Sequence, residues 1–153
     1  MTALEDIYSQ RILELAASIP RTARLAHPDA TETAHSKLCG STITVDLKMD
    51  GDRVTDFAQS VKACLLGQSS ASIVGRLIVG STAGEIRQVA ETMRKMLKEN
   101  GPPPAGKWAD LAVLEPVRDY KSRHTSTLLV FEAIEKAFAR IEAARAGAKA
   151  PAA

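Results

Sequence analysis

The strongest structural signal in the sequence is a switch to a two-residue hydrophobic period in the middle of the chain. Apolar and polar side chains alternate over residues 42–49, which is typical of a strand with one buried face. The next residues, Asp50 and Gly51, are typical of a type I′ turn. We predict a second strand over residues 53–63. The two strands therefore predict a β-hairpin, whose open ends must lie close together in space.

Helical periodicity on both sides of the hairpin predicts the rest of the fold. We expect a third, short strand near residues 31–35. A single domain over residues 1–145 should precede a disordered, low-complexity tail over residues 146–153. The fold class is α+β, a small antiparallel sheet of about three strands packed against about four to five helices on one face. The expected helices are residues 4–19, residues 68–79, a helix that Ser81 or Thr82 caps and Asn100-Gly101 ends, residues 108–114 and residues 122–144.

Composition and charge exclude several classes of function. The net charge of +2 and the few aromatic residues argue against nucleic acid as a partner. No apolar stretch reaches the roughly 18 residues that a membrane span needs. The acidic, helical N-terminal sequence lacks the pattern of a signal peptide, so we expect a cytoplasmic protein. The sequence also contains no P-loop, GxGxxG, HExxH, GxSxG or CxxC motif.

The two cysteines stand at the two open ends of the predicted hairpin. Cys39 precedes the first strand and Cys64 follows the second, so antiparallel pairing should bring both thiols to one end of the sheet. Gly40 permits unusual backbone angles beside the first thiol, and the N-terminus of a following helix favours the thiolate of Cys64. Two neighbouring loop thiols favour a metal or sulfur site over two buried core cysteines.

A third ligand is expected in the loop before the last helix. His124 is a good ligand type there, whereas the hydroxyl of Ser126 is a hard donor that suits thiolate-bound metals poorly. His27 and His35 are nearer the first cysteine in the sequence, and we interpret both as surface histidines. The residues alone therefore leave the third ligand open.

Three segments of the sequence carry a family resemblance. They are LCGSTITVDLKMDGDRVTDF, ACLLGQSSASIV and RHTSTLLVFEAI. The first resembles a Cys-Gly-Asp motif followed by strand, turn and strand, and the second resembles a SufU-type stretch in which Ser-Ser-Ala-Ser follows a cysteine. The third resembles the start of a last helix that carries a third cysteine. Over roughly residues 4–144 the chain thus resembles the IscU, SufU and NifU N-terminal family of iron–sulfur cluster assembly scaffold proteins, which shares its fold with SufE.

The resemblance assigns roles to five positions. Cys39 and Cys64 match the first and second cluster ligands, and Ser126 stands where the third cysteine would be. Ser41 replaces an aspartate that influences cluster retention, and His124 stands one position before the family's histidine. The implied cargo is iron and a transient cluster, of the [2Fe–2S] type.

A scaffold or carrier of this kind binds and transfers its cargo, so no enzymatic turnover is implied. Its implied partners are a cysteine desulfurase, which delivers sulfur, and the apo-proteins that receive clusters. A small thiol, a partner or a second copy of the chain, as a homodimer, would supply the fourth ligand. Three alternatives stay open: a persulfide acceptor resembling SufE, a zinc site at Cys39, Cys64 and His124, and a degenerate relative that only binds partners.

Overall fold

The computed structural model describes residues 8–37 and 40–149. Within them the chain forms a three-stranded antiparallel sheet and a set of helices, which confirms the predicted fold class. The elements in chain order are α2 (Gln10–Ala17), β1 (Ala30–His35), β2 (Thr42–Asp50), β3 (Arg53–Lys62), α3 (Leu65–Leu77), α4 (Ala83–Lys98), the 3₁₀ helices η1 (Gly106–Asp119) and η2 (Lys121–Arg123), and α5 (His124–Lys149).

The sheet has the strand order β1-β2-β3, and both strand pairs are antiparallel. β2 and β3 form the predicted hairpin, with Thr42 opposite Lys62 at its open end. The predicted turn was wrong by one residue, because Asp50 still pairs with Arg53 and the loop is therefore Gly51 and Asp52. Gly51 has a φ of 61°, but Asp52 does not adopt a positive φ. This combination matches a type II′ turn and not a type I′ turn.

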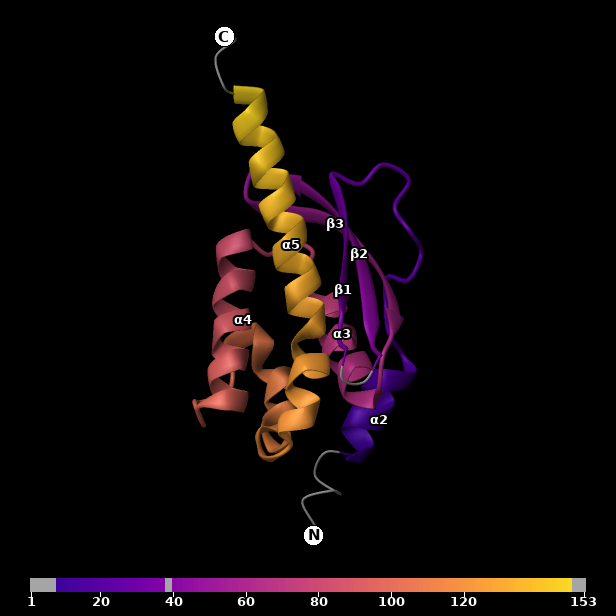
Figure 1. The fold of residues 1–153 in the computed structure, drawn as a ribbon, viewed down its shortest axis with the longest axis vertical. Coiled ribbons are helices and arrows are strands. Elements are labelled where there is room, and N and C mark those ends of the chain that lie inside the picture. The colour runs from indigo at the N-terminus through magenta and orange to yellow at the C-terminus, as the bar shows by residue number, and fades with distance from the viewer. Residues whose placement is uncertain (1–7, 38–39, 150–153) are drawn as a thin grey trace.

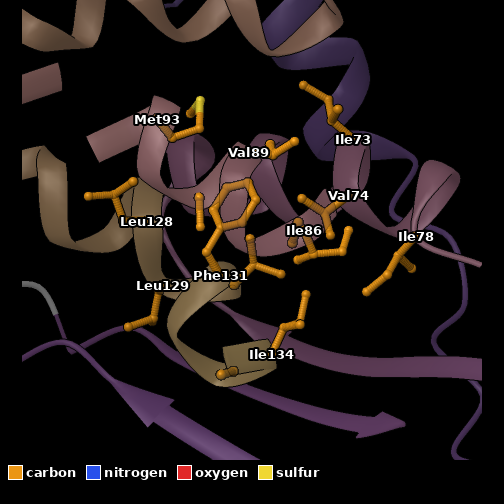
Figure 2. Packing of buried hydrophobic residues seen from close by; sticks show 14 of the residues in the cluster. Ile73, Val74, Ile78, Ile86, Val89, Met93, Leu128, Leu129, Phe131 and Ile134 are labelled. Atoms are coloured by element: carbon orange, nitrogen blue, oxygen red, sulfur yellow. The ribbon is translucent and has the colours of Figure 1, made fainter. Parts of the chain in front are cut away.

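The helices that cover the sheet pack on one of its faces, as predicted. α5 crosses β1 and β2 and contacts both α3 and α4, while α3 packs on β3 and α2 packs on α3 (Figure 1). Ile43, Val45 and Leu47 of β2 point towards the helices, and all three are fully buried. Figure 2 shows Phe131 of α5 in the middle of the core, beside Val89 of α4.

Side-chain caps explain where two of the helices begin. Ser9 Oγ accepts a hydrogen bond from the Ile12 amide at 3.3 Å, which starts α2 at Gln10. Residues 4–7 of the predicted first helix lie outside the described residues. Thr82 Oγ1 accepts from the Glu85 amide at 3.1 Å, which confirms the predicted cap of α4.

No helix in the described part of the chain is both long and apolar enough to cross a membrane.

Two helices extend beyond their predicted bounds. α3 begins at Leu65, earlier than predicted, because Cys64 takes the extended conformation of an N-cap. α5 continues to Lys149, so its bounds include residues 146–149, where we expected the tail to begin. This segment is rich in alanine, the residue with the highest helix propensity. Residues 150–153, the rest of the predicted tail, lie outside the described residues.

η1 replaces the short helix predicted over residues 108–114. It is a longer 3₁₀ helix that includes Pro116, which has no amide hydrogen to donate. Its buried side chains recur at every third position, which matches the three residues per turn of a 3₁₀ helix. These buried residues are Trp108, Leu111, Leu114 and Val117.

The opposite face of the sheet is partly covered by the segment between α2 and β1. Asp46 alternates with the core residues of β2 and so points to this face, yet it is fully buried. The guanidinium of Arg24 donates to both Asp46 oxygens, at 2.6 and 2.9 Å, and the Leu25 amide donates at 3.1 Å. Thr31 Oγ1 donates a further bond at 2.7 Å. The alternating pattern of β2 assigns Asp46 to solvent. In the structure, its hydrogen bonds hold the segment between α2 and β1 against the sheet.

These donors stabilise the ionised form of Asp46. The hydrogen bonds from Arg24 hold the pKa of the Asp46 carboxyl below its ordinary value, against the opposing effect of desolvation, and Thr31 and Leu25 add to the shift. The folded-state pKa therefore lies below the unfolded-state pKa. The resulting stabilisation is complete above the unfolded-state value, near pH 4, and is lost as the pH falls through the folded-state value.

We predict that Asp46→Asn lowers the free energy of unfolding at pH 7 by about 1–2 kcal/mol, a small value because the half-exposed Arg24 remains solvated. The variant should also lose stability less steeply than the wild type between about pH 5 and pH 2. Urea unfolding curves at several pH values measure both effects. Asp56→Asn, at an exposed position of β3, is the matched control and should change neither. Equal acid sensitivity of wild type and Asp46→Asn would contradict the prediction.

Candidate functional site

Cys64 occupies the junction between β3 and α3. It is the N-cap residue of α3, and its carbonyl accepts the first helical hydrogen bond, from the Gln68 amide at 2.9 Å. The thiol does not cap the helix with its own side chain, and the residue is only partly buried. The sulfur is therefore held at a fixed backbone position and keeps its bonding capacity for other groups.

The hydroxyl of Ser126 lies beside this thiol. The distance between Cys64 Sγ and Ser126 Oγ is 3.3 Å, although the two residues are 62 positions apart in the sequence. Ser126 is in the first turn of α5 and is fully buried. Two of the residues singled out in the sequence are thus brought into contact by the packing of α3 against α5.

The hydrogen bonds of Ser126 adapt to either protonation state of the thiol. Ser126 Oγ also lies 3.3 Å from the Arg123 carbonyl oxygen, to which it can donate. When Cys64 is a thiol, its S–H can donate to Ser126 Oγ while the hydroxyl donates to Arg123. When Cys64 is a thiolate, the single hydroxyl proton of Ser126 can turn to the sulfur. The serine therefore complements both states of Cys64.

A glycine makes the close approach of α3 and α5 possible. A Cβ atom at Gly67 would lie 2.8 Å from Ala63 Cβ and 3.1 Å from the backbone oxygen of Ser126. Gln68 Nε2 donates to the Ala63 carbonyl at 2.7 Å and fixes the segment just before the thiol. Sequence reasoning missed both residues, although a glycine in the first turns of a helix was a usable signal.

The loop between β1 and β2 lies at the same end of the sheet as Cys64, because Thr42 at the start of β2 pairs with Lys62 at the end of β3. The Ser36 amide donates to the Ser41 carbonyl at 2.8 Å, and the Gly40 amide donates to the Ser36 carbonyl at 2.8 Å. Gly40 has a φ of 72°, as expected for a glycine that relieves backbone strain. Ser41 is buried at the start of β2. The predicted ligand Cys39 lies outside the described residues.

The structure places the ring of the predicted ligand His124 against the end of η1. Its ring is buried, and Nε2 lies 3.0 Å from the Val117 carbonyl oxygen and 3.1 Å from the Arg118 carbonyl oxygen. A carbonyl oxygen only accepts, so Nε2 carries a proton and donates to the end of η1. Within residues 8–37 and 40–149, no three His, Cys, Asp or Glu side chains gather closely enough to hold a metal ion.

The other two histidines are on the surface, as predicted. His27 is exposed in the segment between α2 and β1. His35 is exposed on β1, where its Nδ1 lies 2.7 Å from Thr42 Oγ1. The serines of α3 are buried and structural: Ser69 Oγ donates to the carbonyl of Ile12 in α2, at 2.8 Å.

We predict that Gly67→Ala separates α3 from α5 at the site, because the added methyl group meets a rigid backbone oxygen. The free energy of unfolding should fall by about 1–3 kcal/mol, the usual cost of overpacking. Gly84→Ala is the matched control, since a Cβ at this position of α4 meets nothing within 4 Å. It should raise the free energy of unfolding by up to about 1 kcal/mol. Urea denaturation distinguishes them, and a Gly67→Ala variant as stable as Gly84→Ala would refute the prediction.

Comparison with known proteins identifies relatives over nearly the whole chain. The chain is 27% identical over 136 residues to the iron–sulfur cluster assembly scaffold protein IscU of Thermotoga maritima, which covers 88% of this chain and 94% of that protein. It is 23% identical over 139 residues to the zinc-dependent sulfurtransferase SufU of Bacillus subtilis, which covers 91% and 94% of the two chains.

Solved structures agree with the sequence matches. The crystal structure of a nitrogen-fixing NifU-like protein (N-terminal) from Brucella abortus has a TM-score of 0.91 and 55% identity, covering 92% of this chain and 98% of that one. A scaffold protein for the SUF system from Fervidobacterium islandicum shares the fold at 20% identity, with a TM-score of 0.80 over 87% of this chain and 97% of that one. The family model of the NifU-like N terminal domain matches residues 7–127. The chain therefore belongs to the NifU-like N-terminal domain family.

Proposed function

We propose that this chain binds iron and an iron–sulfur cluster as cargo through Cys39 and Cys64, with Ser126 as the third ligand. Sulfur would come from a cysteine desulfurase, and the cluster would pass to apo-proteins. The observation that carries the proposal is the 3.3 Å contact between Cys64 Sγ and Ser126 Oγ. The position that resembles the family's third ligand is folded directly against the second, even though its side chain is a hydroxyl.

The donors on this chain suit a transient cargo better than a permanent metal. Thiolates bind iron–sulfur clusters and zinc strongly, whereas a serine hydroxyl is a hard and usually protonated donor. A structural zinc site normally has four protein ligands, and the proposed set has three, one of them weak. The cluster would therefore be labile, which favours transfer by ligand exchange. A partner, a small thiol or a second copy of the chain would complete the coordination.

His124 is not part of the proposed ligand set. Its Nε2 proton is donated to the Val117 and Arg118 carbonyl oxygens, at 3.0 and 3.1 Å. Using Nε2 as a ligand would break both hydrogen bonds inside a buried site, at a cost of about 1–3 kcal/mol if the Arg118 carbonyl is left unpaired, whereas the Val117 carbonyl would keep the Tyr120 amide as its donor. While these bonds persist, Nδ1 is the only ring nitrogen with a lone pair for a metal. The neighbouring hydroxyl of Ser126 already faces the thiol, so the serine is the better candidate.

The proposal predicts the outcome of anaerobic reconstitution with iron and sulfide. The wild type should take up both, with visible absorption bands that Cys39→Ser and Cys64→Ser abolish. Ser126→Cys should lengthen the lifetime of the cluster at least about tenfold, because even outer-shell changes alter metal affinity by about 10–100-fold. Visible absorption and metal analysis measure both effects.

Ser122→Cys is the matched control for the added thiol. Ser122 is exposed in η2, in the same connection between η1 and α5, but is not the residue that contacts Cys64. The Ser122→Cys variant should leave the lifetime of the cluster unchanged. If the wild type takes up zinc and no iron, or if Ser126→Cys behaves like Ser122→Cys, Ser126 is not a cluster ligand.

A second candidate function is acceptance of persulfide sulfur at Cys64. The relative from Bacillus subtilis is named a sulfurtransferase, and Cys64 is partly exposed in this chain. In this step the Cys64 thiolate attacks the outer sulfur of a cysteine persulfide on the desulfurase. A new sulfur–sulfur bond forms on Cys64, and the desulfurase cysteine leaves as a thiolate, so no external oxidant is needed. Ser126 would donate a hydrogen bond to the attacking Cys64 sulfur and keep its proton.

For this function we expect Cys64→Ser to abolish sulfur loading and Cys39→Ser to retain it. The measurement is mass spectrometry of the chain after incubation with a cysteine desulfurase and free cysteine, followed by alkylation. One added sulfur atom on Cys64 is the expected product. Equal loading of Cys64→Ser and wild type would rule out Cys64 as the acceptor.

A further inference from the structure

We propose that His124 is a positioning residue, which sets the contact between Ser126 and Cys64 without binding the cargo. His124 and Ser126 are both in the first turn of α5, two residues apart. Since each helical residue turns by about 100°, their side chains leave the helix about 200° apart, on nearly opposite sides. One side chain can therefore hold the helix while the other reaches the thiol.

The His124 side of this turn is tied to η1. Nε2 donates to two carbonyl oxygens at the C-terminal end of η1, those of Val117 and Arg118. The Val117 carbonyl also accepts from the Tyr120 amide at 2.9 Å, so the buried imidazole adds a second donor there and supplies a donor to the Arg118 carbonyl. This bond is available to both the neutral and the charged imidazole, because Nε2 carries a proton in each.

The opposite side of the turn is tied to α3. Ser126 Oγ meets Cys64 Sγ at 3.3 Å, and the backbone oxygen of Ser126 lies where only a glycine, Gly67, leaves room. The start of α5 is thus fixed between η1 and α3. Without the His124 hydrogen bonds, the first turn of α5 would lose its side-chain link to η1 and keep the contacts of Ser126 with Cys64 and Gly67.

A cleft lies beside His124, on the side of α5 that contacts the end of η1. His124 and Thr125 line a cavity of about 610 Å³ together with Lys98, Arg118 and Lys121, at the ends of α4 and η1. Cys64 and Ser126 are not among the residues that line it. The ring belongs to the side of α5 that faces α4 and η1, and the ligands belong to the side that faces α3.

The test compares His124→Ala, which removes the donor, with His124→Gln, whose amide Nε2 can donate to the same carbonyls. The readout is the alkylation rate of Cys64 by iodoacetamide at one pH, in a Cys39→Ser background that leaves a single thiol. His124→Ala should change this rate by a factor of about 2–10, the range of one hydrogen bond. His124→Gln should restore the wild-type rate, and Thr125→Ala, at the exposed neighbouring position, should not change it.

A double variant separates positioning from a general loss of structure. If His124 acts through Ser126, then His124→Ala should have no further effect on the alkylation rate in a Ser126→Ala background. An equal effect in both backgrounds would overturn the proposal. Because this readout needs no cargo, it holds even if the proposed cluster binding fails.

The reconstituted protein gives an independent check, which rests on the proposed function. Pulsed electron paramagnetic resonance of the reduced cluster, with histidine labelled by ¹⁵N, detects a histidine nitrogen bound to iron. We expect no such coupling in the wild type. A nitrogen coupling that His124→Ala removes would show that His124 is a ligand and would overturn its positioning role.

Discussion

The packing of α5 across one face of the sheet is the interaction on which the rest of the structure depends. α5 contacts β1, β2, α3 and α4, and its side chains Phe131, Ile134 and Phe138 are fully buried between them. Burial of each such side chain contributes about 1.5–3 kcal/mol, so the helix is held firmly along its length. The same packing places its first turn against the N-terminus of α3, and therefore places Ser126 against Cys64.

The candidate site is built on rigid elements, which suits a scaffold that must present its cargo to other proteins. Cys64 is fixed by the end of β3 and the start of α3, and Ser126 is fixed by α5. In the proposed ligand set, a hydroxyl at Ser126 stands where the family pattern has a thiol, and this hydroxyl is held against Cys64. The hydroxyl is accommodated at this buried position within the family fold.

Local patterns in the sequence predicted much of this molecule. The alternating strand, the Thr82 cap and the packing of the helices on one face were all confirmed. The turn was displaced by one residue because Asp50 still pairs with Arg53, and the alternation itself does not specify which residue is the last to pair. The burial of Asp46 was not predictable either, because it depends on Arg24 and Leu25, which arrive from a segment outside the sheet.

The sequence by itself determined the hairpin, the helical periodicity and the family, because these follow from the order of apolar and polar residues along the chain. Only the tertiary structure decided which side of α5 meets the thiol. His124 and Ser126 are two residues apart, and the sequence left the third ligand open between a good ligand type, His124, and a poor one, Ser126. On a helix they point in nearly opposite directions, and the first turn of α5 is held between η1, seven residues back in the sequence, and Cys64, 62 positions from Ser126. The rotation of α5 is a property of the packed core, so no local pattern could specify it.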